Sequence, residues 1–203
     1  MTSLSSAGPV STGNAHPIAH ALHDLGSALW FGGAVMGIAG VNKSGADLKE
    51  GIDRIRVAES AWSRFGPVQW AGIVATLGAD IRLGSVAKKR LAYQRGYGTL
   101  TTVKAVVATA ALASTAYATY TGRKVGEAAE AAHRRGETID VVDASLATDS
   151  TPEELAKWQR RQRVSQYLVP VFAGANITVA SSIAQANRPS ATVKGVIGRL
   201  LPV

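Results

Sequence analysis

Four long stretches of the chain contain almost no charged residues, and this pattern limits what the chain can fold into. They cover about residues 18–41, 65–87, 100–122 and 164–187. A helix needs roughly 20 residues to cross roughly 30 Å of hydrocarbon, and each stretch is long enough. Alanine, glycine, valine and threonine are frequent within them, and small residues let membrane helices approach closely. The sequence therefore predicts an all-α protein, an antiparallel bundle of four transmembrane helices.

The segments between these stretches are polar. Residues 42–64 carry five basic and four acidic side chains, and their apolar residues fall on one helical face, which predicts an amphipathic helix at the membrane surface. Residues 123–163 carry eight basic and eight acidic side chains and are expected to form a long cytoplasmic loop. Residues 1–17 form a polar N-terminal segment and residues 188–203 a basic tail.

The distribution of Lys and Arg predicts the orientation. With both termini outside, the inside segments hold 13 Lys and Arg residues and the outside segments hold 7. Because basic residues favour the cytoplasmic side, we expect a multi-pass protein of the cytoplasmic membrane with both ends outside. The net charge of +8 is explained by this rule and by anionic lipids, so nucleic acid is not an expected partner.

Three of the four histidines, His16, His20 and His23, fall within about 60° of arc on one helical face, with Asp24 beside them. Imidazoles at this spacing can ligate a metal such as copper or provide an axial ligand to haem b. The alternative is that these histidines merely lie at the membrane interface. His16 also precedes Pro17, where the helix is expected to begin.

Ionisable residues in the other stretches are expected near the same histidines. In an antiparallel bundle, the beginnings of the first and third stretches meet the ends of the second and fourth. Asp24, Asp80, Arg82 and Lys104 therefore come to a similar depth. Since charges inside a membrane are costly, we expect carboxylates and cations to pair there. Asp80 and Arg82 point to nearly opposite sides of their helix. Alternatively, the basic side chains reach the head groups and the carboxylates lie in water.

Glycines form a stripe on the first stretch: Gly26, Gly33, Gly37 and Gly40. Small residues spaced in this way allow close helix packing, here with another helix of the chain or with a second copy in a homo-oligomer or larger complex.

The segment His23-Asp24-Leu25-Gly26-Ser27-Ala28-Leu29-Trp30-Phe31-Gly32-Gly33 resembles the first helix of copper-resistance D (CopD)-like bacterial membrane proteins. The related HemJ-type proteins also have a histidine in that helix. The resemblance implies a helical bundle in the cytoplasmic membrane, with His23 as a copper or haem ligand. The overall sequence pattern of the chain is also similar to that of uncharacterised actinobacterial membrane proteins.

Three hypotheses about function follow. The first is a non-catalytic accessory or interaction subunit in the membrane. The second is a haem- or copper-handling membrane protein that uses the histidines of its first helix. The third is a soluble, basic helical protein whose apolar stretches form its core. The sequence has no cysteine and no phosphate loop, nucleophile elbow or zinc-protease motif, so it indicates no particular reaction.

Overall fold

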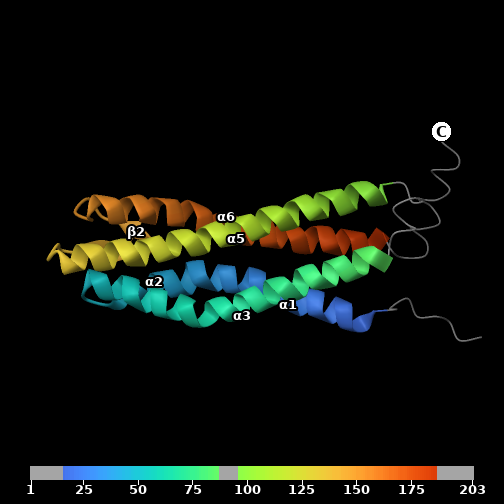
Figure 1. Cartoon of the computed structure of the whole chain (residues 1–203), viewed down its shortest axis with the longest axis horizontal. Helices are drawn as coiled ribbons and strands as arrows, with labels where there is room; N and C mark the ends of the chain where they lie inside the picture. Colours follow the sequence, from blue (N-terminus) through green and yellow to red (C-terminus); the bar gives the residue numbers. More distant parts are fainter. Residues whose placement is uncertain (1–15, 87–95, 187–203) are drawn as a thin grey trace, which may run out of the picture.

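The computed structural model describes residues 16–86 and 96–186, which form a bundle of four long helices (Figure 1). The helices are α1 (Pro17–Met36), α3 (Gly51–Val86), α5 (Tyr97–Arg134) and α6 (Glu153–Ala186). α1 packs mainly against α3, and α5 packs mainly against α6. The start of α1 and the end of α6 lie at the same end of the bundle. The prediction of a helical bundle is confirmed. Residues 1–15 and 188–203 lie outside the described part.

The helical path of α1 continues beyond Met36 through short irregular turns. Gly37–Val41 is a π-helical turn, α2 covers Asn42–Ser44, and a 3-10 turn covers Gly45–Asp47. A π-helical turn inserts an extra residue into the helix and so rotates the residues that follow about the axis. Asn42 follows this turn directly and is buried, with an exposed fraction of 4%.

α3 is one continuous helix where the sequence predicts two elements. It joins the expected surface helix of residues 42–64 to the expected span of residues 65–87, and Pro67 lies within it. Ile52 and Ile55 are buried against α5 and the segment after it rather than lying on a membrane surface. The expectation of an interfacial amphipathic helix is therefore corrected, because protein covers its apolar face.

The expected long loop of residues 123–163 is also largely helical. α5 continues to Arg134 and α6 begins at Glu153, so the connection covers only residues 135–152. Within it, β1 (Val141–Asp143) and β2 (Leu146–Ala147) form a small antiparallel hairpin. The helix continues past residue 123 because Val125, Ala129 and Ala132 form a narrow apolar stripe that is buried in the bundle.

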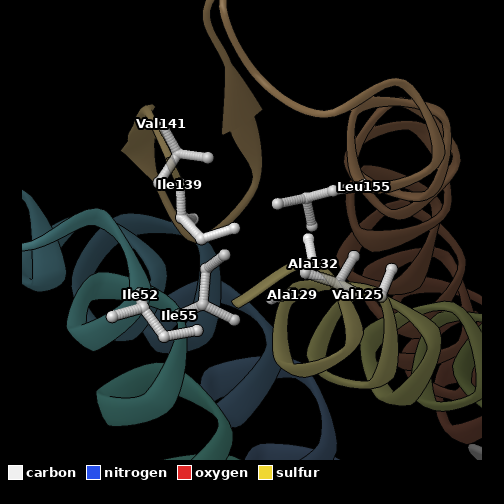
Figure 2. Packing of buried hydrophobic residues seen from close by; sticks show 9 residues of the cluster. Ile52, Ile55, Val125, Ala129, Ala132, Ile139, Val141 and Leu155 are labelled. Atoms are coloured by element: carbon white, nitrogen blue, oxygen red, sulfur yellow. The ribbon is translucent and has the colours of Figure 1, made fainter. Parts of the chain in front are cut away.

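The bundle has two apolar cores, one in each half of its length. One core lies in the charge-rich lobe, which we define as residues 42–64 and 123–163. There, Ile52 and Ile55 of α3, Val125 and Ala129 of α5, and Leu155 of α6 meet residues of the hairpin segment (Figure 2). The other core lies in the apolar half, which comprises residues 17–41, 65–86, 97–122 and 164–186. It includes Trp30, Ala34, Ile73, Ala111, Val169 and Ala173.

The outer surfaces of the two halves differ sharply. Of the large apolar side chains that are exposed, only Leu48, Val57 and Val142 lie in the charge-rich lobe. The apolar half exposes many, including Ile18 and Ile81 (each 75% exposed), Leu25, Val74, Val106 and Val171. A soluble helix normally presents polar residues on its outer face, so this half has the surface of a protein surrounded by an apolar medium.

Three of the described helices are long and apolar enough to cross a membrane: α1 with its continuation to Asp47, α5, and α6. Among the described helices, α3 is long enough but not apolar enough to join these three. Its C-terminal half contains Gln69, Thr76, Asp80 and Arg82, which lower its mean hydropathy. The predicted span at residues 65–87 is therefore helical, but its crossing of a membrane stays a prediction.

The glycine stripe of α1 faces α3. A methyl group on Gly26 would lie 2.4 Å from the carbonyl oxygen of Gly72, and on Gly33 it would lie 2.5 Å from the ring of Phe65. On Gly37 it would lie 2.1 Å from the ring of Trp62. Gly40 faces Met36 of its own helix instead. Three of the four glycines thus allow close packing between α1 and α3 of the same chain.

Candidate functional site

Charged side chains are rare in the apolar half. Within its described residues, the Asp, Glu, Lys and Arg side chains are those of Asp24, Asp80, Arg82 and Lys104. They come from α1, α3 and α5, and three of them gather around one buried histidine, His23. We call His23, Asp24, Asp80 and Lys104 the ion-pair cluster. Its members come from three helices, so it depends on how the bundle packs.

The ion-pair cluster centres on a short contact between α3 and α5. Nζ of Lys104 lies 2.5 Å from Oδ1 of Asp80 and 3.1 Å from Nε2 of His23. Nε2 of His23 is also 3.4 Å from Oδ1 of Asp80. The side chains of Asp80 and Lys104 are only 19% and 14% exposed, and that of His23 is 8% exposed. Opposite charges this close and this shielded attract each other more strongly than a surface pair does, but their removal from water offsets much of that gain.

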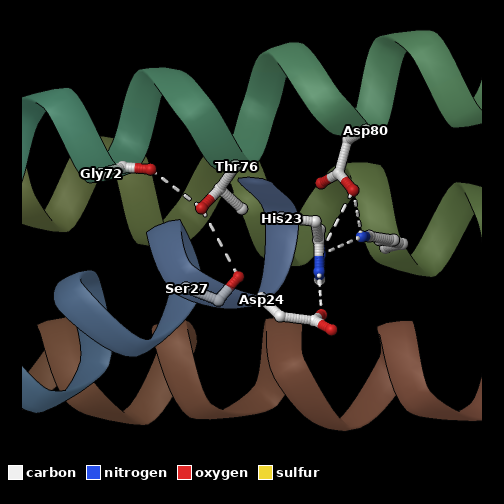
Figure 3. A network of polar contacts seen from close by, with 7 residues as sticks. His23, Asp24, Ser27, Gly72, Thr76 and Asp80 are labelled. Atoms are coloured by element: carbon white, nitrogen blue, oxygen red, sulfur yellow. Dashed lines mark hydrogen bonds and ion pairs between the residues drawn. The ribbon is translucent and has the colours of Figure 1, made fainter. Parts of the chain in front are cut away.

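The other ring nitrogen of His23 faces a carboxylate at the surface. Nδ1 of His23 lies 3.0 Å from Oδ1 of Asp24, whose side chain is 78% exposed. Figure 3 shows the His23 ring between the carboxylates of Asp24 and Asp80. With a proton on Nδ1 alone, the imidazole donates to Asp24 and accepts from the Lys104 ammonium at Nε2, although the 3.4 Å approach of Nε2 to Oδ1 of Asp80 is then not a hydrogen bond. A proton on Nε2 would instead face that ammonium.

A layer of hydroxyl groups lies beside the cluster. Oγ1 of Thr76 donates to the carbonyl oxygen of Gly72 at 2.9 Å and lies 3.5 Å from Oγ of Ser27 (Figure 3). Ser27 is one helical turn from His23 on α1, and Thr76 is one turn from Asp80 on α3. Both hydroxyl-bearing residues are buried. The polar contacts between α1 and α3 therefore continue from the ion-pair cluster toward the centre of the apolar half.

The cluster lies at the end of the apolar half that is remote from the charge-rich lobe. Between its residues and the first basic residues of the lobe (Lys43, Arg64 and Arg123) there are 16 to 20 positions on each helix. At 1.5 Å per residue this is about 24–30 Å, close to the thickness of the hydrocarbon layer. The cluster and the lobe thus mark the two edges of one apolar belt.

Other residues singled out from the sequence do not join the cluster. Arg82 is exposed, on the other side of α3 from Asp80, as the spacing of these residues predicts. It lines a cavity of about 370 Å³ together with His16. Neither His16 nor His20 makes a side-chain contact with the cluster, and the described residues contain no group of three His, Asp or Glu side chains arranged to hold a metal ion. Both ring nitrogens of His23 are engaged by neighbouring side chains, and the copper and haem hypotheses stay predictions.

A second polar network lies where the apolar half meets the charge-rich lobe. Oδ1 of Asn42 accepts a hydrogen bond from Nε1 of Trp62 at 3.0 Å, and Nδ2 of Asn42 donates to Oε1 of Gln166 at 2.6 Å. The backbone oxygen of Asn42 also accepts from the amide of Ala144 in the hairpin. Asn42, the first residue of α2, therefore ties this segment to α3, α6 and the hairpin. Sequence reasoning missed it, because one asparagine beside a charged segment carries no specific signal.

Asn176 presents the opposite situation. It lies in α6 within the apolar half and is 1% exposed, yet neither Nδ2 nor Oδ1 of its side chain has a hydrogen-bond partner among the described residues. The sequence indicates a packed polar contact at this position. The burial agrees, but no partner side chain is present in the described part. Burying an amide without a partner costs free energy, so this position is expected to weaken the bundle.

Comparison of the chain with models of protein families, with curated proteins and with solved structures finds no match. The interpretation of the site therefore rests on the geometry described above.

Proposed function

We propose that the chain is a multi-pass protein of the cytoplasmic membrane in which all four long helices cross the bilayer, and that it acts as a non-catalytic accessory or interaction subunit. The observation that carries this proposal is the segregation of the surface. Exposed large apolar side chains crowd the apolar half, and charged side chains crowd the lobe. Surroundings that change from lipid to water along the bundle favour such a surface.

The packing of α1 against α3 supports a crossing by α3. The contacts of Gly26 with Gly72, of Gly33 with Phe65 and of Gly37 with Trp62 run along the second half of α1 and the turn that follows it. Two helices in such close contact cover the same depth there. Among the polar residues of α3, Gln69 and Thr76 are buried and Asp80 is paired with Lys104. Paired or inward-facing polar groups are tolerated within a bilayer. Arg82 is exposed near the end of α3, where a long basic side chain can reach the head groups.

Exposed basic residues support the predicted orientation. Lys43, Arg64, Arg123 and Arg163 lie at the boundary between the apolar half and the charge-rich lobe, and all four are exposed. Basic residues at this level favour the cytoplasmic leaflet, where anionic lipids are found. We therefore propose that the lobe is cytoplasmic and that both termini are outside.

The role of an accessory or interaction subunit is supported by the character of the two polar sites. The side chains of the ion-pair cluster engage one another across three helices, which suits a structural tie. The charge-rich lobe has its own core and extends beyond the apolar belt, so its outer face is available to a partner in water. The haem- or copper-handling alternative stays a prediction. Absorbance near the Soret region and metal analysis of the purified protein test it.

Single-cysteine labelling tests the proposed membrane arrangement, because the chain has no cysteine of its own. Val142 in the hairpin is 44% exposed, and Val74 on α3 is 67% exposed. In permeabilised membranes, a water-soluble maleimide is expected to modify V142C and to leave V74C unmodified, because lipid excludes the reagent from the latter. Both variants should react after the membrane has been dissolved in denaturant. Equal labelling of V74C and V142C in the permeabilised membranes would contradict a crossing by α3.

Fractionation and reporter fusions complete the test. Recovery of the protein in the supernatant, after membranes are pelleted, would favour the soluble alternative. Topology reporters joined after residues 14, 92, 145 and 203 should report one side for 14, 92 and 203 and the other side for 145. The same side for 92 and 145 would contradict the four-span arrangement. For the accessory role, a photo-crosslinker attached to V142C is expected to yield one discrete adduct in native membranes.

A further inference from the structure

An apolar groove of about 730 Å³ runs along the outside of the α1–α3 pair. Its walls include Leu29 and Met36 of α1 and Trp62 and Phe65 of α3. Gly32 and Gly33 also line it. Gly32 faces open space, since a methyl group added there would meet no atom within 4 Å. The groove exists because these glycines leave room beside bulky neighbours, and it lies within the apolar half.

One end of the groove lies at the boundary with the charge-rich lobe. Val41 and Trp62 line the groove at this end, and the hydrogen bond from Trp62 to Asn42 fixes the indole there. Lys43 lies two residues beyond Val41, and Arg64 directly precedes Phe65. Both basic side chains are exposed, and neither has an ion-pair partner among residues 16–86 and 96–186. Neither cation lines the groove itself, but both follow or precede its lining residues in the chain, so the groove ends at the level of two exposed cations.

The carboxylates near this end do not neutralise the cations. Glu59 lies against Gly126 of α5, where a methyl group would come within 2.7 Å of its Oε2, so it points away from α1. Asp47 forms no ion pair with Lys43. The mouth of the groove therefore offers positive charge at the level where lipid head groups meet the protein.

We propose that this groove binds an anionic phospholipid, with one acyl chain along the glycines of α1 and the phosphate beside Lys43 and Arg64. The inference rests on the proposed membrane location. A zwitterionic lipid such as phosphatidylcholine also carries a phosphate, but its ammonium group offsets that charge, so it matches the two cations less well than an anionic lipid does. The apolar face of a second helix would leave both cations unmatched. An anionic glycerophospholipid meets both features, and the predicted orientation places its head group in the cytoplasmic leaflet, where such lipids are found.

Quenching of Trp62 by brominated lipids tests the proposal. The protein is reconstituted into vesicles of phosphatidylcholine with a minor fraction of phosphatidylglycerol, and bromine is placed on the acyl chains of one lipid or the other. The signal of Trp62 is the difference between the unmodified protein and W62F. A basic residue near a lipid surface strengthens the binding of anionic lipid about fivefold, so with two such residues we expect a preference for phosphatidylglycerol of up to about 25-fold. Native mass spectrometry of adducts with the same two lipids provides a second measurement.

Two matched pairs of variants locate the site. K43Q/R64Q is expected to reduce the preference for phosphatidylglycerol to within about twofold, whereas K157Q/R160Q, which neutralises two exposed basic residues of α6, should keep it. G32L should fill the groove and lower quenching of Trp62 by both lipids. The control is G78L, at a glycine of α3 that also faces open space, and it should leave quenching of Trp62 unchanged.

The outcomes separate this inference from the proposed function. Equal quenching by the two lipids, in a protein that floats with the vesicles, would overturn the anionic-lipid site and leave the membrane location intact. Floating protein with no quenching of Trp62 by either lipid would show that protein, such as a second copy, covers the groove, and would also overturn the inference. Protein that does not float with the vesicles would contradict the proposed function itself.

Discussion

Nζ of Lys104 on α5 lies 2.5 Å from Oδ1 of Asp80 on α3, although the two residues are 24 positions apart in the sequence. The contact joins the α1–α3 pair to the α5–α6 pair at the end of the bundle remote from the lobe. His23 lies against both partners and adds α1 to the same contact.

Neutralising Lys104 should destabilise the bundle more than neutralising Arg82. K104M leaves the shielded carboxylate of Asp80 without its cation, and we expect a loss of about 2–3 kcal/mol in the free energy of unfolding. R82Q, two residues beyond Asp80 on α3, removes an exposed charge and should change it by less than about 0.5 kcal/mol. Unfolding by SDS in mixed micelles measures both. The double variant D80N/K104M should be more stable than K104M, because no unpaired charge remains.

A methyl group added at Gly26 or at Gly32 of α1 should have opposite effects on the free energy of unfolding. In G26A the new Cβ meets the backbone of α3, which cannot move away without separating the helices, so we expect a loss of about 1–3 kcal/mol. In G32A the methyl group enters open space and alanine favours the helix more than glycine does, so the free energy of unfolding should stay unchanged or rise by up to about 1 kcal/mol. The same unfolding measurement compares the two variants. Equal losses would show that α1 and α3 are less closely packed than described.

The two buried asparagines should differ in the sign of their effect. N42L removes an amide that accepts from Trp62 and donates to Gln166, and leaves those groups unpaired, so we expect a loss of about 1–3 kcal/mol. N176L replaces an amide that has no partner among the described residues, so it should leave stability unchanged or raise it by about 1 kcal/mol. Thermal unfolding in detergent tests the pair. A loss in N176L as large as that in N42L would show that Asn176 has a partner.

The pair formed by Arg56 and Glu130 predicts a pH dependence in the charge-rich lobe. Nε and Nη2 of Arg56 donate to the two carboxylate oxygens of Glu130 at 2.7 and 3.2 Å. The side-chain hydrogen bond from Arg56 lowers the pKa of Glu130 below the ordinary glutamate range. Because the folded-state pKa is depressed, the contribution is complete above the ordinary glutamate pKa and is lost as the pH falls through the lowered value.

The E130Q variant isolates that contribution. At neutral pH the unmodified protein should be slightly more stable than E130Q, since the pair is partly exposed and therefore weak. The difference should vanish at a pH below the lowered pKa, where the carboxyl group is protonated in both the folded and the unfolded chain. Asp149 is an exposed carboxylate in the connection between α5 and α6 and has no side-chain partner among the described residues. The difference between the unmodified protein and D149N should therefore show no comparable dependence on pH. Thermal unfolding over a pH series gives the comparison. A difference that stayed constant with pH would contradict the assignment.

The sequence predicted local features well. The beginning of the first helix at Pro17, the opposite directions of Asp80 and Arg82, and the apolar spacing of Ile52 and Ile55 all follow from helical periodicity. The partners of these residues did not follow. Ile52 and Ile55 were assigned to a membrane surface because an apolar stripe shows that something covers it, but does not show whether lipid or protein does so.

Sequence alone determined that the four charge-poor stretches are helical, that one half of the bundle is poor in charge, and that the few ionisable residues of that half lie near one depth. Each of these follows from the order of residues along a single chain, because helical periodicity and the length of an apolar run are local properties. Tertiary structure alone decided that His23 meets Asp80 and Lys104, that Asn42 joins three helices to the hairpin, and that the charged segments fold into a lobe. Those contacts depend on the rotation and register of one helix against another, which packing across the whole bundle sets.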